Sequence, residues 1–328
     1  TGVQTCALPI YAITPLDRLA YMGKRAMGAL EFRPQRGPAA RKPTAIELGE
    51  LVGVARQALS GSWHDDDSSA AALRSILEVG TSAGGARAKA VVAWNPTTNE
   101  LRSGQLDAPA GFEHWLLKFD GVGVDRELGT SMDHGRIEFA YHRMAVEAGI
   151  TMAPCLLLAE GPRRHFMTKR FDRGDAGAKH HVVSLCGLAH LDFNMLATHS
   201  YDQYLQAVTA LGLDREARAE AYRRMAFNVA AVNRDDHTKN FSFLREQGGP
   251  WTLSPAYDVT HAYAADSRWT ARHLMSVNGR FEGITLDDLH AVGERHNVPG
   301  YRQIVRDVLA AVARWPAFAE ASEVEPVE

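Results

Sequence analysis

Apolar and polar residues alternate between positions 90 and 119 in the manner typical of β-strands. An apolar run at 90–94 is followed by a turn built on Asn95, Pro96 and Asn99. Residues 115–119 alternate again, so that one face is aromatic and aliphatic and the opposite face carries Lys118. Further apolar runs at 155–160 and 165–171 flank Gly161 and predict a hairpin there.

The apolar spacing becomes helical after Ile137. Residues 137–145 place their apolar side chains on one helical face, and Gly149 ends this predicted helix. Residues 222–232 predict a buried helix that runs up to Asn233, and residues 301–315 predict a last amphipathic helix. Other expected elements are helices at 45–59, from 66 onward and from a capping box at Thr285 and Asp288, and a hairpin turn at Asn278 and Gly279. The patterns predict an α+β protein with a strand-rich N-terminal half and a helical C-terminal half.

Composition narrows the class of protein. The chain has 328 residues, of which 45% are hydrophobic and 23% charged, as in ordinary globular proteins. A net charge of -3 argues against a domain whose main affinity is for nucleic-acid phosphates. Three widely spaced cysteines provide no disulfide framework, which fits a cytoplasmic protein, and no apolar run is long enough to predict a transmembrane helix. The chain lacks an initiating Met and residues 1–10 resemble a translated sequencing adapter, so we expect a non-native leader at 1–12; rereading the source nucleotides tests this.

The segment at 231–243, A-V-N-R-D-D-H-T-K-N-F-S-F, concentrates polar chemistry between apolar flanks. Asp235, Asn240 and the later Asp258 supply the carboxylates and amide oxygen that magnesium-assisted phosphoryl transfer requires. Two other interpretations stay open. The segment could be a salt-bridged, solvated loop, or Asp236, His237 and His261 could form a zinc site.

Two upstream elements favour a nucleotide site. Residues 80–89, G-T-S-A-G-G-A-R-A-K, are rich in small side chains whose backbone amides could approach phosphates, although the Walker pattern is absent and a flexible turn is the alternative. Lys118 could bind phosphate oxygens while Glu138 holds it. A solvent-facing lysine and an ordinary N-terminal helix charge are the simpler interpretations of these two residues.

The order of these motifs, together with T-K-R-F-D-R and S-P-A-Y-D-V, resembles the HipA family of serine/threonine kinases, the toxins of type II toxin-antitoxin pairs. The resemblance covers about residues 14–292. It implies a bilobed protein-kinase-like α+β fold with a small extra subdomain. The implied units are a truncated N-terminal subdomain at 13–78, an N-lobe at 79–172 and a C-lobe at 173–328.

The resemblance also assigns roles by position. It implies that Asp235 is the catalytic base, that Asn240 and Asp258 bind Mg²⁺, and that Lys118 binds the phosphates of ATP. The remaining nucleotide-binding residues would be Gly84, Gly85, Ala86, Arg87, Ala88 and Lys89 in a phosphate loop, Lys169, Arg170 and Phe171 in a hinge, and His237, Thr238, Lys239, Asn240, Tyr257 and Asp258. Ser82 aligns with a serine that family members autophosphorylate, and Thr81 is a neighbouring acceptor.

The partners implied by the resemblance are ATP, a protein substrate such as an aminoacyl-tRNA synthetase, and a HipB-like helix-turn-helix antitoxin through which DNA would be reached only indirectly. No membrane partner is implied. The chain departs from better-known members at 183–190, V-S-L-C-G-L-A-H, where they have an acid-rich stretch, and at Lys169, where a glutamate is common. Two other functions remain open, a small-molecule kinase of the aminoglycoside type and a binding subunit that mainly sequesters the antitoxin and aids repression.

Overall fold

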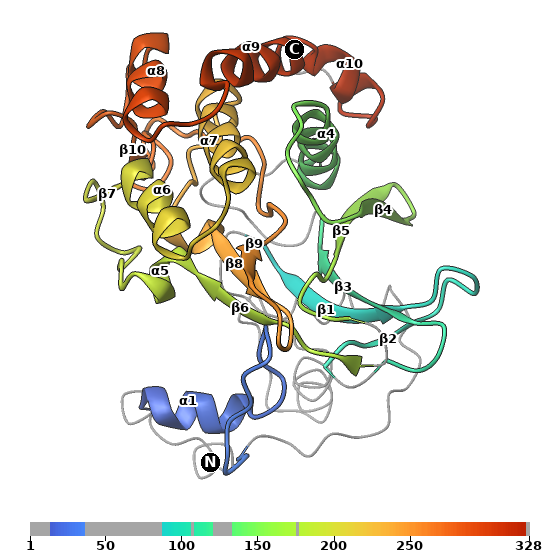
Figure 1. Ribbon diagram of the computed structural model, residues 1–328. Coiled ribbons are helices and arrows are strands. Elements are labelled where there is room, and N and C mark those ends of the chain that lie inside the picture. Colours follow the sequence, from blue (N-terminus) through green and yellow to red (C-terminus); the bar gives the residue numbers. More distant parts are fainter. Residues whose placement is uncertain (1–13, 37–86, 106–107, 121–132, 175–176, 326–328) are drawn as a thin grey trace.

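The computed structural model describes residues 14–36, 87–105, 108–120, 133–174 and 177–325 (Figure 1). Within these ranges a strand-rich part is followed by a mainly helical part. The helices are α1 (Pro15–Met22), α4 (His134–Glu147), α5 (Leu185–Leu188), α6 (Tyr201–Ala210), α7 (Arg215–Ala230), α8 (Leu286–Arg295), α9 (Tyr301–Val312) and α10 (Trp315–Glu320), with a 3₁₀ turn at Thr238–Asn240. The strands are β1 (Lys89–Trp94), β2 (Leu101–Ser103), β3 (Glu113–Lys118), β4 (Cys155–Glu160), β5 (Arg163–Lys169), β6 (His181–Ser184), β7 (His199–Ser200), β8 (Ser242–Arg245), β9 (Trp251–Leu253) and β10 (Met275–Ser276).

The strand-rich part is a five-stranded antiparallel sheet in the order β2-β1-β3-β5-β4. The central strand β3 pairs Lys118 with Lys89 on β1 and with Phe166 on β5. Trp115 and Leu117 lie in a small hydrophobic core on one face, while Lys118 faces the other side and is also buried. The predicted strands, the hairpin and the two faces of β3 are therefore confirmed.

Helix α4 joins the sheet to the helical part. It packs against β4 and β5 on one side and against α9 and α10 on the other (Figure 1). The helix begins three residues before the predicted Ile137, and the chain leaves it at Gly149, whose φ of 83° suits glycine. Gly135 permits the close packing, since a Cβ added there would lie 2.1 Å from the carbonyl oxygen of Arg164.

The larger core is built around α4, α6, α7 and α9, where Tyr201, Tyr204, Tyr222 and Phe227 are fully buried. Two small sheets accompany these helices. Strands β6, β8 and β9 form an antiparallel sheet, and β7 and β10 form a parallel pair. The second half of the chain therefore combines its helices with short strands.

Several boundaries differ from the prediction. The helix expected up to Asn233 ends at Ala230, and the helix expected over 301–315 is divided into α9 and α10. Pro316 lies in the first turn of α10, and because proline donates no backbone N–H it cannot continue a preceding helix. The hairpin turn at Asn278 and the Thr285 capping box are confirmed.

The structure confirms an α+β fold. The helices expected at 45–59 and from 66, and most of the subdomain expected at 13–78, lie outside the described residues. Among the residues that are described, no helix is both long enough and apolar enough to span a bilayer.

Candidate active site

A cavity of about 370 Å³ lies where the five-stranded sheet meets the helical part. This volume falls within the range of small-molecule sites, about 300–1,000 Å³. Its wall is mainly apolar, with charged groups from β3, α4 and the segment after β9. The lining residues are Met27, Leu116, Lys118, Glu138, Met152, Cys155, Phe166, Thr168, Lys169, Arg170, Phe171, Asp172, Val182, Ser184, Ser242, Tyr257, Asp258 and Val259.

Lys118 lies at the centre of the charged groups in this cavity. Its Nζ donates to Glu138 Oε1 at 2.5 Å and also to the Asp258 carboxylate. The second oxygen of Glu138 accepts from Arg87 Nη2 at 2.7 Å, and Lys89 Nζ lies 3.8 Å from Asp258. Three cations and two acids, from β1 and the residues before it, β3, α4 and the segment after β9, therefore form one cluster. It includes the contact between Lys118 and Glu138 expected from the sequence.

Electrostatics fix the charges in this cluster. Burial alone would lower the pKa of Lys118, but the carboxylates of Asp258 and Glu138 outweigh it and raise that pKa. Burial alone would raise the pKa of Asp258, but Lys118 and Lys89 hold the pKa of this carboxyl well below its usual range. Lys118 is therefore cationic and Asp258 anionic at neutral pH.

Asp235 follows α7 in a loop whose start is fixed through its backbone. Backbone hydrogen bonds join Val232 and Arg234 to Ala262, and Val232 has a positive φ of 56°. The Asp235 carboxylate lies 3.7 Å from His237 Nε2 and keeps 46% of its side-chain surface exposed. Desolvation by the surrounding protein raises the pKa of Asp235 to about 6, and the nearby Asp258 acts in the same direction. An accessible carboxylate with this pKa suits a general base.

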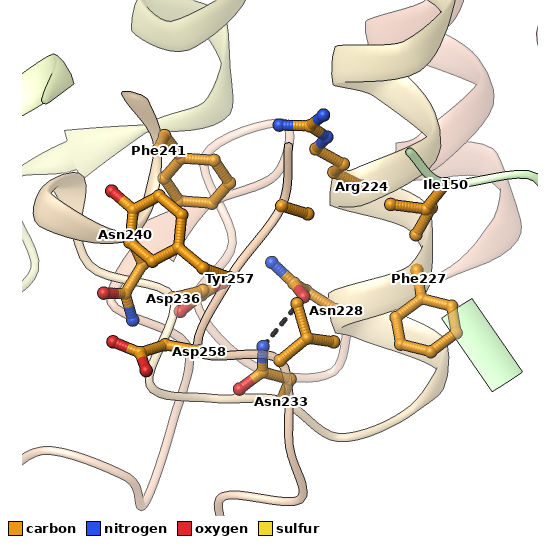
Figure 2. A pocket seen from close by; sticks show the side chains of 12 residues that line it. Ile150, Arg224, Phe227, Asn228, Asn233, Asp236, Asn240, Phe241, Tyr257 and Asp258 are labelled. Carbon is orange, nitrogen blue, oxygen red and sulfur yellow. Dashed lines mark hydrogen bonds between the residues drawn. The ribbon is translucent and has the colours of Figure 1, made fainter. Parts of the chain in front are cut away.

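Asn240 and Asp258 lie together beside a second, smaller cavity (Figure 2). The side-chain amide of Asn240 donates to the Asp235 carbonyl at 2.8 Å, which turns its oxygen away from that carbonyl. Asp258 has a φ of 53°, a strained conformation that is found at functional sites. An amide oxygen and a carboxylate are a donor set that fits a hard cation such as Mg²⁺.

Asp236, next to the candidate base, is 1% exposed. Its carboxylate accepts from Tyr201 Oη at 2.8 Å and from the backbone N–H of Leu274 at 2.7 Å, and it lies 2.8 Å from His273 Nδ1. Sequence reasoning missed this role because the partners are 35 to 38 residues away. Asp236 is therefore neither solvated nor free for the zinc site considered above, and among the described residues no group of three His, Cys, Asp or Glu side chains could hold a metal ion.

A buried network continues from Tyr201 into α7. Asn228 donates to Tyr201 Oη at 3.0 Å, and Asn233 donates to Asn228 at 2.9 Å, the contact drawn in Figure 2. At the C-terminal end of α7, Tyr141 of α4 donates from its hydroxyl to the carbonyl of Ala231 at 2.7 Å. The start of the Asp235 loop is therefore held by α4 as well as by α6.

The predicted hinge residues line the cavity, with their side-chain charges paired. Lys169 contacts Glu113 at 2.7 Å, and Arg170 donates to Asp172 at 2.7 and 2.9 Å. The ring of Phe171 lies 5.8 Å from that of Tyr257.

Two residues of the 3₁₀ turn, Thr238 and Lys239, make their side-chain contacts outside the large cavity. Thr238 is fully buried and donates to the Leu191 carbonyl, while Lys239 Nζ lies 3.3 Å from the ring centroid of Phe193, which also packs edge-on against His237. Neither side chain lines the large cavity. In the predicted phosphate loop, Ala88 is buried and its carbonyl accepts from the N–H of Phe119, directly after β3. The loop residues Gly84, Gly85 and Ala86, and the acceptors Thr81 and Ser82 before them, lie outside the described residues.

The fold is that of an α+β protein, with the candidate site between its sheet and its helices. Residues 81–315 match the family model of the HipA-like C-terminal domain. The chain therefore belongs to the HipA-like family, as the motifs predicted.

Three known proteins are similar to this chain to different degrees. The HipA chain of the Shewanella oneidensis MR-1 toxin-antitoxin complex of HipA, HipB and operator DNA superimposes with a TM-score of 0.68 at 17% identity. The match covers 99% of this chain and 76% of that one. The curated protein Y4dM of Sinorhizobium fredii, described as a candidate kinase, is 35% identical over 95 residues, which are 28% of this chain and 22% of Y4dM. The proinflammatory kinase CtkA of Helicobacter pylori is more distant, with a TM-score of 0.40 and 11% identity over 74% of this chain and 91% of its own.

Proposed function

We propose that the chain is an ATP- and Mg²⁺-dependent serine/threonine protein kinase of the HipA type. The observation that supports this most is the convergence of Lys118, Glu138 and Asp258 on one cavity wall, beside a loop that carries Asp235 and Asn240. This set combines a phosphate-binding cation, its anchor, a pair of oxygen ligands and a base, which are the parts that phosphoryl transfer needs.

In the proposed reaction Asp235 accepts the proton of a substrate serine or threonine hydroxyl while the hydroxyl oxygen attacks the γ-phosphorus of ATP. The bond from that phosphorus to the bridging oxygen breaks, and ADP leaves with the electron pair. Lys118 holds the phosphate oxygens, and the loop amides near Arg87 contribute hydrogen bonds. Asn240 and Asp258 would hold Mg²⁺, which neutralises charge on the phosphates when it is bound.

The experiment compares purified wild-type chain with Asp235→Asn, using γ-labelled ATP and Mg²⁺. Asp287→Asn is the matched control, because Asp287 is exposed on α8, outside the site. We expect Asp235→Asn to lose at least about a hundredfold in phosphate incorporation while it still binds ATP, and Asp287→Asn to keep the wild-type rate. Equal incorporation by wild type and Asp235→Asn rules out this base. If Mg-ATP produces no thermal shift in the wild type, the kinase proposal fails.

Ser82 is the proposed autophosphorylation site, with Thr81 as a neighbouring acceptor. Mass spectrometry after incubation with Mg-ATP should find the phosphate on one of these two residues. Phosphate found only elsewhere on the chain rejects Ser82.

A second part of the proposal concerns the partner. The Shewanella HipA structure contains HipB and operator DNA, and by analogy we propose that this chain binds a HipB-like antitoxin and meets DNA only through it. Co-expression with the product of a neighbouring small helix-turn-helix gene should yield a stable complex on a sizing column. Separate elution of the two proteins argues against this role.

A further inference from the structure

Met27 is the one residue before β1, among the described residues, that lines the large cavity. It follows α1 in a segment without regular structure, far outside the residues matched by the HipA-like C-terminal domain. Its side chain is 54% exposed, whereas Ala26 before it is 7% exposed and Gly28 after it is buried. A wall residue with buried neighbours and an exposed apolar side chain has surface available to a ligand.

The backbone on both sides of Met27 is tied to the residues after β5. The N–H of Gly28 donates to Asp172 Oδ2 at 2.7 Å, and the Arg173 guanidinium donates to the carbonyls of Ala26 and Gly28 at 3.1 Å each. Asp172 is 1% exposed. Burial alone would raise the pKa of Asp172, but Arg170 and Arg173 outweigh this effect and hold that pKa below its usual value. The carboxylate that accepts the hydrogen bond from Gly28 is therefore charged. Charge-assisted hydrogen bonds of this kind fix a backbone firmly.

The hydrogen bonds of Ala26 and Gly28 to Asp172 and Arg173 place Met27 at one end of the cavity. Lys118 is opposite Phe166 on β5, whereas Lys169 is opposite Trp115, three residues further along. Three residues of strand span about 10 Å. Asp172 lies beyond Lys169, and a Cβ on Gly28 would lie 3.2 Å from the backbone nitrogen of Val182, another lining residue. Met27 is therefore at the end of the cavity remote from Lys118.

We propose that Met27 is a nucleotide-binding residue that packs its thioether side chain against the purine ring. This inference rests on the proposed kinase function, because the purine reaches the Met27 end of the cavity only if the phosphates of ATP lie at Lys118. Methionine suits the role, since its flexible side chain and sulfur pack favourably on aromatic rings. The segment after α1 thus completes a nucleotide pocket whose other parts belong to the family domain.

Calorimetric titration of the whole chain tests this proposal with two ligands, Mg-ATP and Mg-tripolyphosphate, which lacks a base. The variant is Met27→Ala and the matched control is Leu30→Ala, because Leu30 is 55% exposed on the same segment and does not line the cavity. We expect Met27→Ala to weaken Mg-ATP binding about five- to tenfold and to leave tripolyphosphate affinity unchanged. Leu30→Ala should change neither affinity.

The possible results separate the two proposals. Wild-type affinity of Met27→Ala for Mg-ATP overturns the role of Met27 and leaves the kinase proposal intact. An equal loss of affinity for both ligands also overturns it, because a contact with the purine cannot affect the binding of tripolyphosphate. A wild type that binds neither ligand overturns the kinase proposal itself. Gly28→Ala gives a second measurement, since its φ of 77° and the close Val182 should displace the segment and weaken Mg-ATP binding without touching Met27.

Discussion

The Lys118 ammonium lies 2.5 Å from Glu138, and both side chains are almost fully buried. Glu138 contacts Arg87 as well, so one carboxylate of α4 pairs with a cation of β3 and with a cation that precedes β1. Two buried cations would repel each other strongly without the acid between them. The position of Glu138 on α4 therefore sets the geometry of the charged wall.

Replacement of Glu138 by Gln should destabilise the protein by about 3 kcal/mol and reduce Mg-ATP affinity at least about tenfold, because Arg87 loses its carboxylate partner and Lys118 keeps only Asp258. Urea unfolding and titration measure the two effects. Glu147→Gln is the control on the same helix. Its pair with Arg314 is at least half exposed and should contribute no more than about 1 kcal/mol. Equal effects of the two changes would show that Glu138 has no special role.

The rate of phosphate transfer should follow the ionisation of Asp235. Only the carboxylate accepts a proton, so the rate should rise with pH through an apparent pKa of about 6 and level off above it. A pH-rate profile at saturating Mg-ATP measures this. A midpoint near the ordinary value for aspartate would contradict the environment described for this residue.

Asp235→Asn should also change how stability depends on pH. The folded-state pKa of Asp235 is raised from 3.8 to about 6, so the folded chain binds this proton more tightly than the unfolded chain does. Stability contributed by this residue therefore falls as pH rises from about 4 to about 6. The melting temperature of Asp235→Asn, relative to that of the wild type, should therefore increase between pH 4 and pH 7. The gain should be absent for Asp287→Asn.

Asp236→Asn should lower the free energy of unfolding by about 2–4 kcal/mol, because a buried carboxylate with three neighbouring donors loses its charge. Asp266→Asn, at an exposed position, should stay within about 0.5 kcal/mol of the wild type. Chemical denaturation checks both values. An unchanged midpoint for Asp236→Asn would mean that the network does not hold the loop.

Gly135→Ala should cost about 1–3 kcal/mol, because the new methyl group would meet the Arg164 carbonyl and push α4 away from β5. Gly187→Ala is a fitting comparison in α5, where the nearest atom would be 3.4 Å away and alanine favours helix. The same denaturation measurement applies. We expect Gly135→Ala to lose phosphate transfer as well, since α4 carries Glu138.

Local patterns in the sequence predicted the elements that depend on local spacing. The two faces of β3, the apolar face of α4 and the Thr285 capping box all follow from residues within a few positions of each other. The pairing of Lys118 with Glu138 could also be predicted, because a strand lysine in a nucleotide site requires a nearby acid.

Features that depend on distant partners could not be predicted in this way. Strands β7 and β10 have two residues each and pair across 76 positions, so neither has a pattern of its own. Asp236 resembled a solvated charge because nothing local points to His273. The hydrogen bonds from Arg173 to Ala26 and Gly28, on either side of Met27, likewise join parts of the chain 147 and 145 residues apart.

Helix α4 contacts both halves of the candidate site within one turn. Glu138 holds the cations of the sheet, and Tyr141, three residues later, holds the Ala231 carbonyl at the start of the Asp235 loop. Three residues of helix span about 4.5 Å along the axis. One helical turn therefore sets the spacing between the proposed phosphate-binding groups and the proposed base. A movement of the sheet relative to the helices that keeps both contacts would leave this spacing unchanged.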